Sequence, residues 1–185
     1  MPAPLVLASR SPQRRAILAR LGVDFVVRPS GVEELEAGPA DRVATENALR
    51  KARAAARPGE LVLGVDTVVT LDAALYGKPP DEAAAREMLG VLGGRTHTVV
   101  SGLALLRGDR ERMATARTEV TFRPLSDALL DWYVATGEWR ERAGGYAIQG
   151  AGAALVTRVA GDYENVVGLP VATLVDLAPE ILTGT

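Results

Sequence analysis

The sequence contains no cysteine and a single histidine, His97. Without thiols, a disulfide framework, a thiolate zinc site and a cysteine nucleophile are excluded. A single imidazole also excludes a multi-histidine metal site, so any bound metal would be a hard ion held by carboxylates. No motif around His97 completes a Ser-His-Asp set, and we expect this histidine to be a hydrogen-bonded residue of a sheet.

Aromatic residues are scarce, and charges of the two signs nearly cancel. Two Phe, four Tyr and two Trp are too few for the usual base-stacking platform of a nucleic-acid-binding protein. The 21 basic and 23 acidic residues give a formal net charge of −2, which disfavours a DNA- or RNA-binding domain. We therefore expect no stable nucleic-acid partner, while a local cluster of Arg and Lys remains compatible with a small anion.

Long hydrophobic runs are also missing, since no segment approaches the roughly 20 apolar residues of a membrane-spanning helix. The apolar run Leu5–Ala8 is short and follows no positively charged region, so it predicts a first strand and not a signal peptide. We expect a cytoplasmic protein with no membrane partner. The 185 residues, 48% of them hydrophobic, are enough to bury a core and predict one domain over residues 1–185.

Helix and strand signals alternate along the chain. Apolar β-rich runs predict strands at 5–8, 24–28, 61–71, 96–106 and 112–122, the last two as a hairpin around Gly108-Asp109. Helix formers and capping residues predict helices at 12–21, 41–57, 81–92, 126–137 and 171–182, with N-caps at Ser11, Asp81 and Ser126. Loops are expected at 75–80 and 162–170, and short strands beside the glycines at 144–145 and 150–152. This order predicts an α/β fold with a mixed sheet.

The first strand-to-helix turn, Ser9–Arg15, combines two serine hydroxyls with three arginines at the start of a helix. Free backbone N–H groups, the positive end of the helix dipole and guanidinium groups are the components of an anion-binding cradle. The alternative is an N-cap followed by a solvated arginine face, and the turn by itself does not distinguish the two.

Further polar residues stand where ligands are commonly bound, although each has a purely structural alternative. Asp66 ends an apolar strand, where a carboxylate is a turn residue or else holds Mg²⁺ or orients a water. The chain's two lysines are Lys51, beside other basic residues of a helix, and Lys78, in the stiff loop 77–80. Glu33 lies in an acidic loop, and Gln149 either reads the edge of a base or satisfies nearby backbone groups.

Taken in order, these segments resemble the Maf family of nucleoside triphosphate pyrophosphatases. Eight short motifs carry the resemblance, which covers nearly the whole chain: 7–18, 32–34, 47–52, 62–69, 77–79, 92–99, 143–150 and 165–170. The resemblance implies hydrolysis of a nucleoside triphosphate between its α- and β-phosphates, giving a monophosphate and pyrophosphate. It also implies an elongated mixed sheet flanked by helices, two lobes with a central cleft as in inosine triphosphate pyrophosphatases, and a homodimer.

The resemblance also assigns roles to individual residues. Asp66 would be the catalytic base or a ligand of a required divalent cation, Mg²⁺ or Mn²⁺, and Glu33 is a candidate ligand of the metal or of a water. The phosphates would be bound by Ser9, Arg14, Lys51 and Lys78. Arg14 and Lys78 would also neutralise charge as it moves onto the leaving pyrophosphate. The positions at which the family selects dTTP and UTP are matched by Gln13, Thr67 and Gln149.

The sequence departs from the family pattern at two places. Gln13 stands where the dTTP/UTP branch usually has an arginine, which leaves the base preference open. Residues 139–142, Trp-Arg-Glu-Arg, stand where Pro-x-Asp-Lys is common. Glu141 and Arg142 keep the charge signs, but arginine in place of lysine changes the donor geometry. The alternative hypotheses are a pyrophosphatase that prefers other or modified bases, and a nucleotide-binding regulator of cell division without turnover. An RNA-binding protein is disfavoured by the charge balance.

Overall fold

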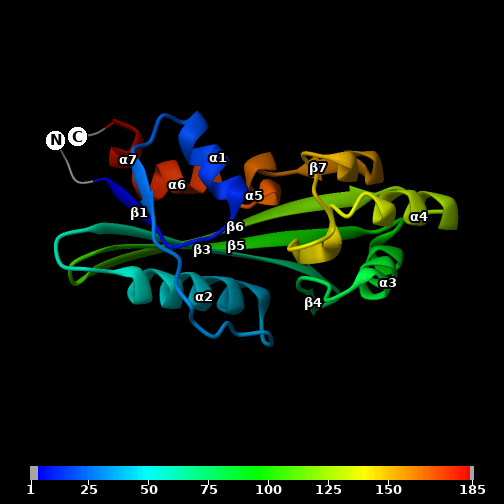
Figure 1. Ribbon diagram of the computed structural model, residues 1–185, viewed down its shortest axis with the longest axis horizontal. Coiled ribbons are helices and arrows are strands. Elements are labelled where there is room, and N and C mark those ends of the chain that lie inside the picture. The colour runs from blue at the N-terminus through cyan, green and yellow to red at the C-terminus, as the bar shows by residue number, and fades with distance from the viewer. Residues whose placement is uncertain (1–3, 184–185) are drawn as a thin grey trace.

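The computed structural model describes residues 4–183 and shows an elongated α/β molecule built on one mixed sheet (Figure 1). The strands lie in the order β2-β1-β3-β5-β6-β7, and β4 pairs with the far end of β3. β1 is parallel to β2 and to β3, whereas the other pairs are antiparallel. The strands are β1 Leu5–Leu7, β2 Phe25–Val27, β3 Leu61–Leu71, β4 Ala74–Tyr76, β5 Thr96–Arg107, β6 Arg110–Phe122 and β7 Val156–Ala160. The predicted fold class is confirmed.

Seven α-helices and two 3₁₀ turns are found among the described residues. They are α1 Pro12–Arg20, α2 Ala40–Ala55, α3 Glu82–Leu92, α4 Asp127–Ala135, η1 Ala143–Gly145, η2 Ala151–Leu155, α5 Tyr163–Val167, α6 Val171–Leu177 and α7 Glu180–Thr183. The three predicted N-caps are confirmed, because the side chains of Ser11, Asp81 and Ser126 each accept a hydrogen bond from a backbone N–H in the first turn of their helix. None of the helices within residues 4–183 is long and apolar enough to cross a membrane.

Four local predictions were wrong. The expected loop at 75–80 begins with β4, which turns back from β3 through Asp72 and Ala73, both with positive φ. The expected loop at 162–170 contains α5. The helix predicted at 171–182 is broken at Ala178, since a residue that precedes a proline, here Pro179, is disfavoured in the helical region. In place of strands beside the glycines at 144–152 there are two 3₁₀ turns, because positive φ at Gly144 and Gly145 turns the chain away from an extended path.

Three buried clusters divide the molecule into two lobes that share the long strands β3, β5 and β6. In the first lobe both faces of the sheet are covered, one by α2 over Val6 and Val62, and the other by α1 and α6 over Leu7 and Leu63. In the second lobe α3, α4 and the 3₁₀ turns pack around Tyr133 on one face of the sheet. Two lobes on one continuous sheet agree with the expected architecture (Figure 1).

The cleft between the lobes begins at an unpaired stretch of β3. This strand pairs with β1 at Val62 and Leu63 and with β4 at Val69 to Leu71. Between those segments, residues 64–68 have no strand on that side within the described part of the chain. Asp66 and Thr67 lie in this gap, so the sheet leaves them open to the space between the lobes.

Candidate active site

A cavity of about 970 Å³ opens beside the unpaired stretch of β3 and is lined by residues from both lobes. Eight of the nine predicted site residues line it: Ser9, Gln13, Arg14, Lys51, Asp66, Thr67, Lys78 and Gln149. We call Ser9, Arg14, Lys51, Asp66 and Thr67 the inner wall, and Lys78, Glu141, Arg142 and Gln149 the outer wall. Positions far apart in the sequence are therefore brought together, while their individual roles stay predictions.

Arg14 is buried in the inner wall, where each guanidinium nitrogen donates a hydrogen bond to a neutral acceptor. Nε donates to the carbonyl of Gly168 at 2.8 Å, Nη1 to Ser9 Oγ at 2.9 Å and Nη2 to Thr67 Oγ1 at 3.1 Å. Burial lowers the pKa of Arg14, and no carboxylate among residues 4–183 forms an ion pair with it. The three acceptors fix the orientation of the guanidinium and leave its charge for an anion in the cavity.

Both carboxylate oxygens of Asp66 are held by donors from α2. Lys51 Nζ lies 2.6 Å from Oδ1, and Asn47 Nδ2 donates to Oδ2 at 3.2 Å. The side chains of Lys51 and Asp66 are 11% and 8% exposed. Lys51 Nζ also lies 2.8 Å from a carboxylate oxygen of Glu34. The carboxylate of Asp66 is thus fixed at the cavity surface, with a cation beside it.

Two glycines allow α2 to lie close enough to the sheet for these contacts. A Cβ at Gly64 would stand 2.0 Å from the carbonyl oxygen of Ala48, and one at Gly102 would stand 2.4 Å from the backbone of Ala44. No side chain larger than hydrogen fits at either position. Because Asn47 and Lys51 are four residues apart, they share one face of the helix, and close packing places both beside Asp66.

Asn47 is a functional candidate that the sequence reasoning missed. Its Oδ1 accepts the N–H of Leu35 at 2.7 Å and its Nδ2 donates to the carbonyl of Leu35 at 3.0 Å. The same side chain reaches Asp66, and it is 1% exposed. Asn47 therefore ties the acidic loop 28–39 to the carboxylate. The sequence did indicate this residue, because Asn47 lies one helical turn before Lys51 in the motif 47–52. Only the lysine of that motif was considered as a site residue.

The acidic loop places Glu34, and not Glu33, at the cavity. Glu33 is exposed and does not line it, and its backbone carbonyl accepts a hydrogen bond from Arg50. Within residues 4–183 no group of three or more His, Asp or Glu side chains is arranged to hold a metal ion. Glu34 and Asp66 flank Lys51 Nζ, so the chain offers two carboxylates. This donor set fits a Mg²⁺ that is bound by one or two carboxylates and completed by phosphate and water oxygens.

The outer wall is more open than the inner wall. Lys78 Nζ contacts Glu141 at 2.9 Å, and these side chains are 58% and 84% exposed. Behind this wall, the hydroxyl of Tyr146 lies 2.9 Å from Nε2 of the buried His97. Desolvation lowers the pKa of His97 to about 4, so the imidazole is neutral near pH 7. The prediction of a hydrogen-bonded sheet histidine is confirmed.

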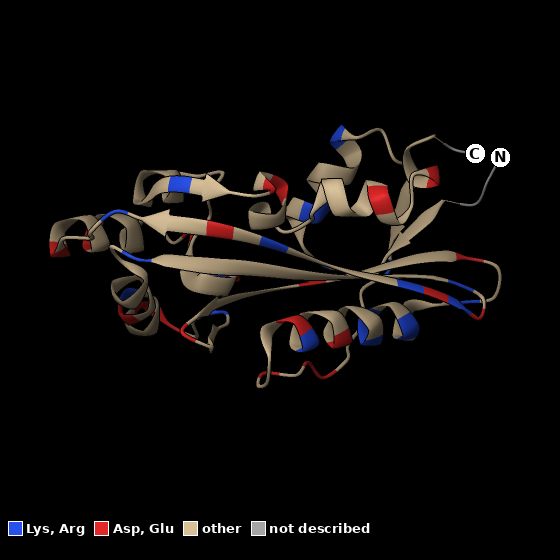
Figure 2. Cartoon of the chain, turned by 180° about the vertical axis from the view of Figure 1, so that it is seen from behind, with Lys and Arg blue, Asp and Glu red and all other residues tan. Residues whose placement is uncertain are grey.

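Charges of both signs line the cavity in nearly equal number. The cations are Arg10, Arg14, Lys51, Lys78 and Arg142, and the carboxylates are Glu34, Glu36, Asp66 and Glu141. The helix α2 beside the cavity likewise carries both signs along its length (Figure 2). A polyanion would therefore be bound by individually placed donors and by any cation that it carries, and not by a uniformly positive surface.

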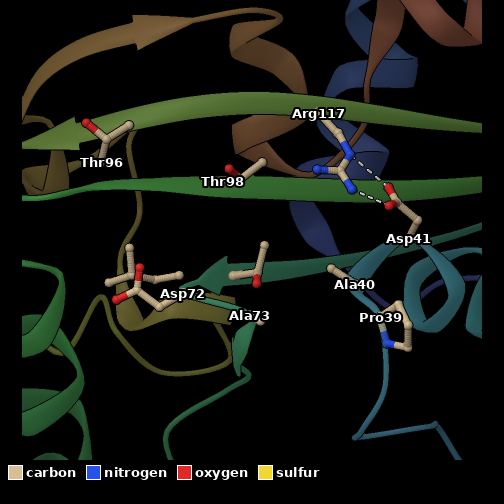
Figure 3. A pocket seen from close by; sticks show the side chains of 10 residues that line it. Pro39, Ala40, Asp41, Asp72, Ala73, Thr96, Thr98 and Arg117 are labelled. Carbon is tan, nitrogen blue, oxygen red and sulfur yellow. Dashed lines mark hydrogen bonds and ion pairs between the residues drawn. The ribbon is translucent and has the colours of Figure 1, made fainter.

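A second, smaller cavity of about 380 Å³ lies on the uncovered sheet face beyond the start of α2 (Figure 3). Threonine side chains of β5 and the turn residues Asp72 and Ala73 border it, and the ion pair between Asp41 and Arg117 lies at one side (Figure 3). None of the nine predicted site residues lines this hollow. The candidate chemistry is therefore concentrated in the larger cavity.

Comparisons with known proteins agree with the arrangement of fold and cavity. The family model described as "Maf-like protein" matches residues 4–181. A Symbiobacterium thermophilum protein named dTTP/UTP pyrophosphatase is 48% identical over 94% of this chain and 91% of its own length. Proteins of the same name from Pyrococcus furiosus and Moorella thermoacetica are 45% and 49% identical, over 94% of this chain in each case and 93% and 92% of their own lengths. The chain belongs to the family of Maf-like proteins.

Proposed function

We propose that this protein hydrolyses the bond between the α- and β-phosphates of nucleoside triphosphates, with dTTP and UTP as its preferred substrates. The observation that carries the proposal is one cavity faced by the fixed guanidinium of Arg14, the held carboxylate of Asp66 and the ammonium of Lys78. The name shared by relatives that cover nearly the whole chain supports both the reaction and the two bases.

In the proposed reaction, the inner wall acts on the α-phosphate. Asp66 orients a water and takes its proton, and the water oxygen forms a bond to the α-phosphorus. The bond from the α-phosphorus to the oxygen that bridges to the β-phosphate breaks, and pyrophosphate leaves with the electron pair. Lys51 stands beside Asp66, while Arg14 offers hydrogen bonds to phosphate oxygens as negative charge moves onto the leaving group.

A divalent cation, Mg²⁺ or Mn²⁺, would be held by Asp66 and Glu34 together with phosphate oxygens and would supply additional positive charge at the phosphates. Glu34 replaces Glu33 as the candidate ligand, because Glu34 and not Glu33 lines the cavity. Removal of the cation with a chelator is expected to abolish turnover, and its return should restore it.

Base selection is assigned to Gln13 and Gln149, whose amide side chains line the cavity and present both donors and acceptors. Thr67 supports the site in another way, since its hydroxyl accepts a hydrogen bond from Arg14 and shares one with Ser101 at 2.8 Å. Its hydroxyl is thus already engaged with the inner wall.

The experiment that tests the function is incubation with a panel of nucleoside triphosphates, each with Mg²⁺ or Mn²⁺, followed by identification of the products. The expected result is a nucleoside monophosphate with pyrophosphate, fastest for dTTP and UTP. Release of orthophosphate with a nucleoside diphosphate would reject the assigned bond. Tight binding of the nucleotides with no product would favour the regulator without turnover.

The homodimer and the cytoplasmic location stay predictions. Sedimentation of the purified protein over a range of concentrations tests the first, because a dimer sediments with twice the monomer mass. Fractionation of cells that express the chain tests the second, with recovery in the soluble cytoplasmic fraction as the expected result.

A further inference from the structure

Arg142 is a cation of the outer wall whose side chain has no partner among residues 4–183. It lines the cavity, and its Nε is buried without a hydrogen bond. No ion pair and no side-chain hydrogen bond joins its guanidinium to any other described residue. An Arg side chain has five N–H donors and no acceptor, so this guanidinium has lost water at Nε without gaining a protein acceptor.

The other buried or paired cations of the cavity differ from Arg142 in this respect. Lys51 lies between two carboxylates, and Lys78 contacts Glu141. Arg14 has no carboxylate partner within residues 4–183, but all three of its guanidinium nitrogens donate to protein acceptors. In Arg142 both the charge and the donors are unused, which is the state expected of a group that binds an anion supplied from outside the protein.

The backbone around Arg142 holds it in place. Its N–H donates to the carbonyl of Trp139 at 3.3 Å, and its carbonyl accepts the N–H of Gly145 at 3.1 Å. Glu141, immediately before it, has φ of 60°, in the left-handed region that non-glycine residues rarely adopt. Such a conformation persists when the surrounding structure imposes it, and strained backbone of this kind concentrates at functional sites.

Burial is the main influence on the charge of Arg142. Desolvation lowers its pKa, and the nearby Tyr133 and Glu138 oppose that shift. Glu138 is not an ion-pair partner, and its carboxylate accepts the N–H of Gly152 at 3.4 Å. The guanidinium remains charged near pH 7, because even a lowered arginine pKa leaves it protonated.

We propose that Arg142 is a substrate-binding residue that contacts the phosphate chain of the nucleotide from the second lobe, next to Lys78 and across the cavity from Arg14. The proposal deepens the proposed function and rests on it. A guanidinium can form two parallel hydrogen bonds to phosphate oxygens, so the phosphate chain would be gripped from both lobes.

The test measures equilibrium binding of α,β-methylene-UTP, which cannot be cleaved between its α- and β-phosphates, in the presence of Mg²⁺. Arg142→Gln is expected to raise the Kd on the order of 10- to 100-fold, as for the loss of a charged hydrogen-bonding group, and to reduce its dependence on salt. Arg142→Lys, which keeps the charge but loses the paired donors, should lie between Arg142→Gln and the unmodified protein. The matched control is Arg140→Gln, because Arg140 is exposed, packs over the Trp139 ring at 4.6 Å and does not line the cavity.

A Kd of Arg142→Gln equal to that of Arg140→Gln would overturn the proposal. If Arg142→Gln fails to fold, as judged by its thermal unfolding, Arg142→Lys decides, and an unchanged Kd for that variant counts against the proposal. Pyrophosphate release by the unmodified protein is measured separately. A protein that hydrolyses dTTP but binds the analogue without help from Arg142 keeps the proposed function and loses this inference. If binding of the analogue depends on Arg142 but the unmodified protein releases no pyrophosphate, the role of Arg142 in phosphate binding is supported and the proposed hydrolysis is rejected.

Discussion

The two walls of the cavity are built in different ways. In the inner wall, Arg14, Lys51 and Asp66 are buried and each makes hydrogen bonds to other groups of the protein. In the outer wall, Lys78 and Glu141 form an exposed ion pair and Arg142 has no partner within the described residues. The side chains of the inner wall are therefore held in fixed positions, as a group that acts on one reacting phosphorus requires. The donors of the outer wall, Lys78 and Arg142, can change position when a ligand binds.

The largest expected effect is at the carboxylate of the inner wall. Asp66→Asn removes the proposed base while an amide of the same shape can still accept from Asn47. We expect the rate of pyrophosphate release to fall on the order of 10²- to 10⁴-fold. Glu141→Gln, the matched change in the outer wall, should alter the rate by only a few-fold. Comparable losses for the two variants would mean that the walls do not differ as described.

Replacing the lysine of each wall tests the difference in burial between the walls through the free energy of unfolding. Lys51→Met leaves Asp66 buried without its cation, and breaking such a pair costs about 3 kcal/mol or more in the free energy of unfolding. Lys78→Met breaks an exposed pair and should change this free energy by no more than about 0.5 kcal/mol. Urea unfolding of both variants measures the difference. Equal destabilisation would contradict the burial contrast between the walls.

The buried His97, which lies behind the outer wall, makes the stability of the fold depend on pH. The pKa of His97 is about 4 in the folded protein, below its ordinary 6.5, so the unfolded chain binds the proton more readily between these values. The stability contributed by neutral His97 is present above pH 6.5 and is lost as the pH falls toward 4. Between pH 7 and pH 5 the loss is about 2 kcal/mol.

The His97→Gln variant lacks this titrating group. From pH 7 to pH 5, the free energy of unfolding of the variant should therefore fall by about 2 kcal/mol less than that of the unmodified protein. Denaturant unfolding at the two pH values, with the unmodified protein as the reference, measures the change. Parallel pH profiles for the two proteins would show that His97 is not buried as a neutral group.

The smallest expected effect is a change of base preference on substitution of Gln13, the residue before Arg14 of the inner wall. Gln13 lines the cavity and its Oε1 accepts a hydrogen bond from Ser11. Gln13→Arg introduces the arginine that the family resemblance leads us to expect at this position, and it should change the ratio of kcat/KM between UTP and CTP by roughly 10-fold. The same substrate panel measures the ratio. An unchanged ratio would remove Gln13 from the specificity residues.

Much of the fold and of the inner wall was predictable, because local signals and global structure agree there. Ser11 and Pro12 define the start of α1, and the apolar run before Asp66 defines β3. The helix period then places Lys51 on the face of α2 that packs on β3, and Ser9 follows the end of β1. Asp66, expected at the end of a strand, lies instead inside β3, which continues to Leu71.

The rest depended on contacts that no local pattern encodes. Glu33 and Glu34 are adjacent acidic residues in an irregular loop, and the bond from Leu35 to Asn47 decides which of them faces the cavity. That Arg142 has no side-chain partner among the described residues becomes visible only in the assembled second lobe. The break before Pro179, in contrast, followed a known backbone rule that helical periodicity had hidden.

The continuity of β3, β5 and β6 through both lobes has a mechanical consequence. Because β3, β5 and β6 are hydrogen-bonded to one another through both lobes, we expect the sheet to resist the rotation that occurs between domains joined by a linker. The width of the cleft between the lobes is therefore set by the length of strand that separates them. Movement at the cavity is therefore expected in the loops at its rim, such as the acidic loop 28–39, and not in the sheet.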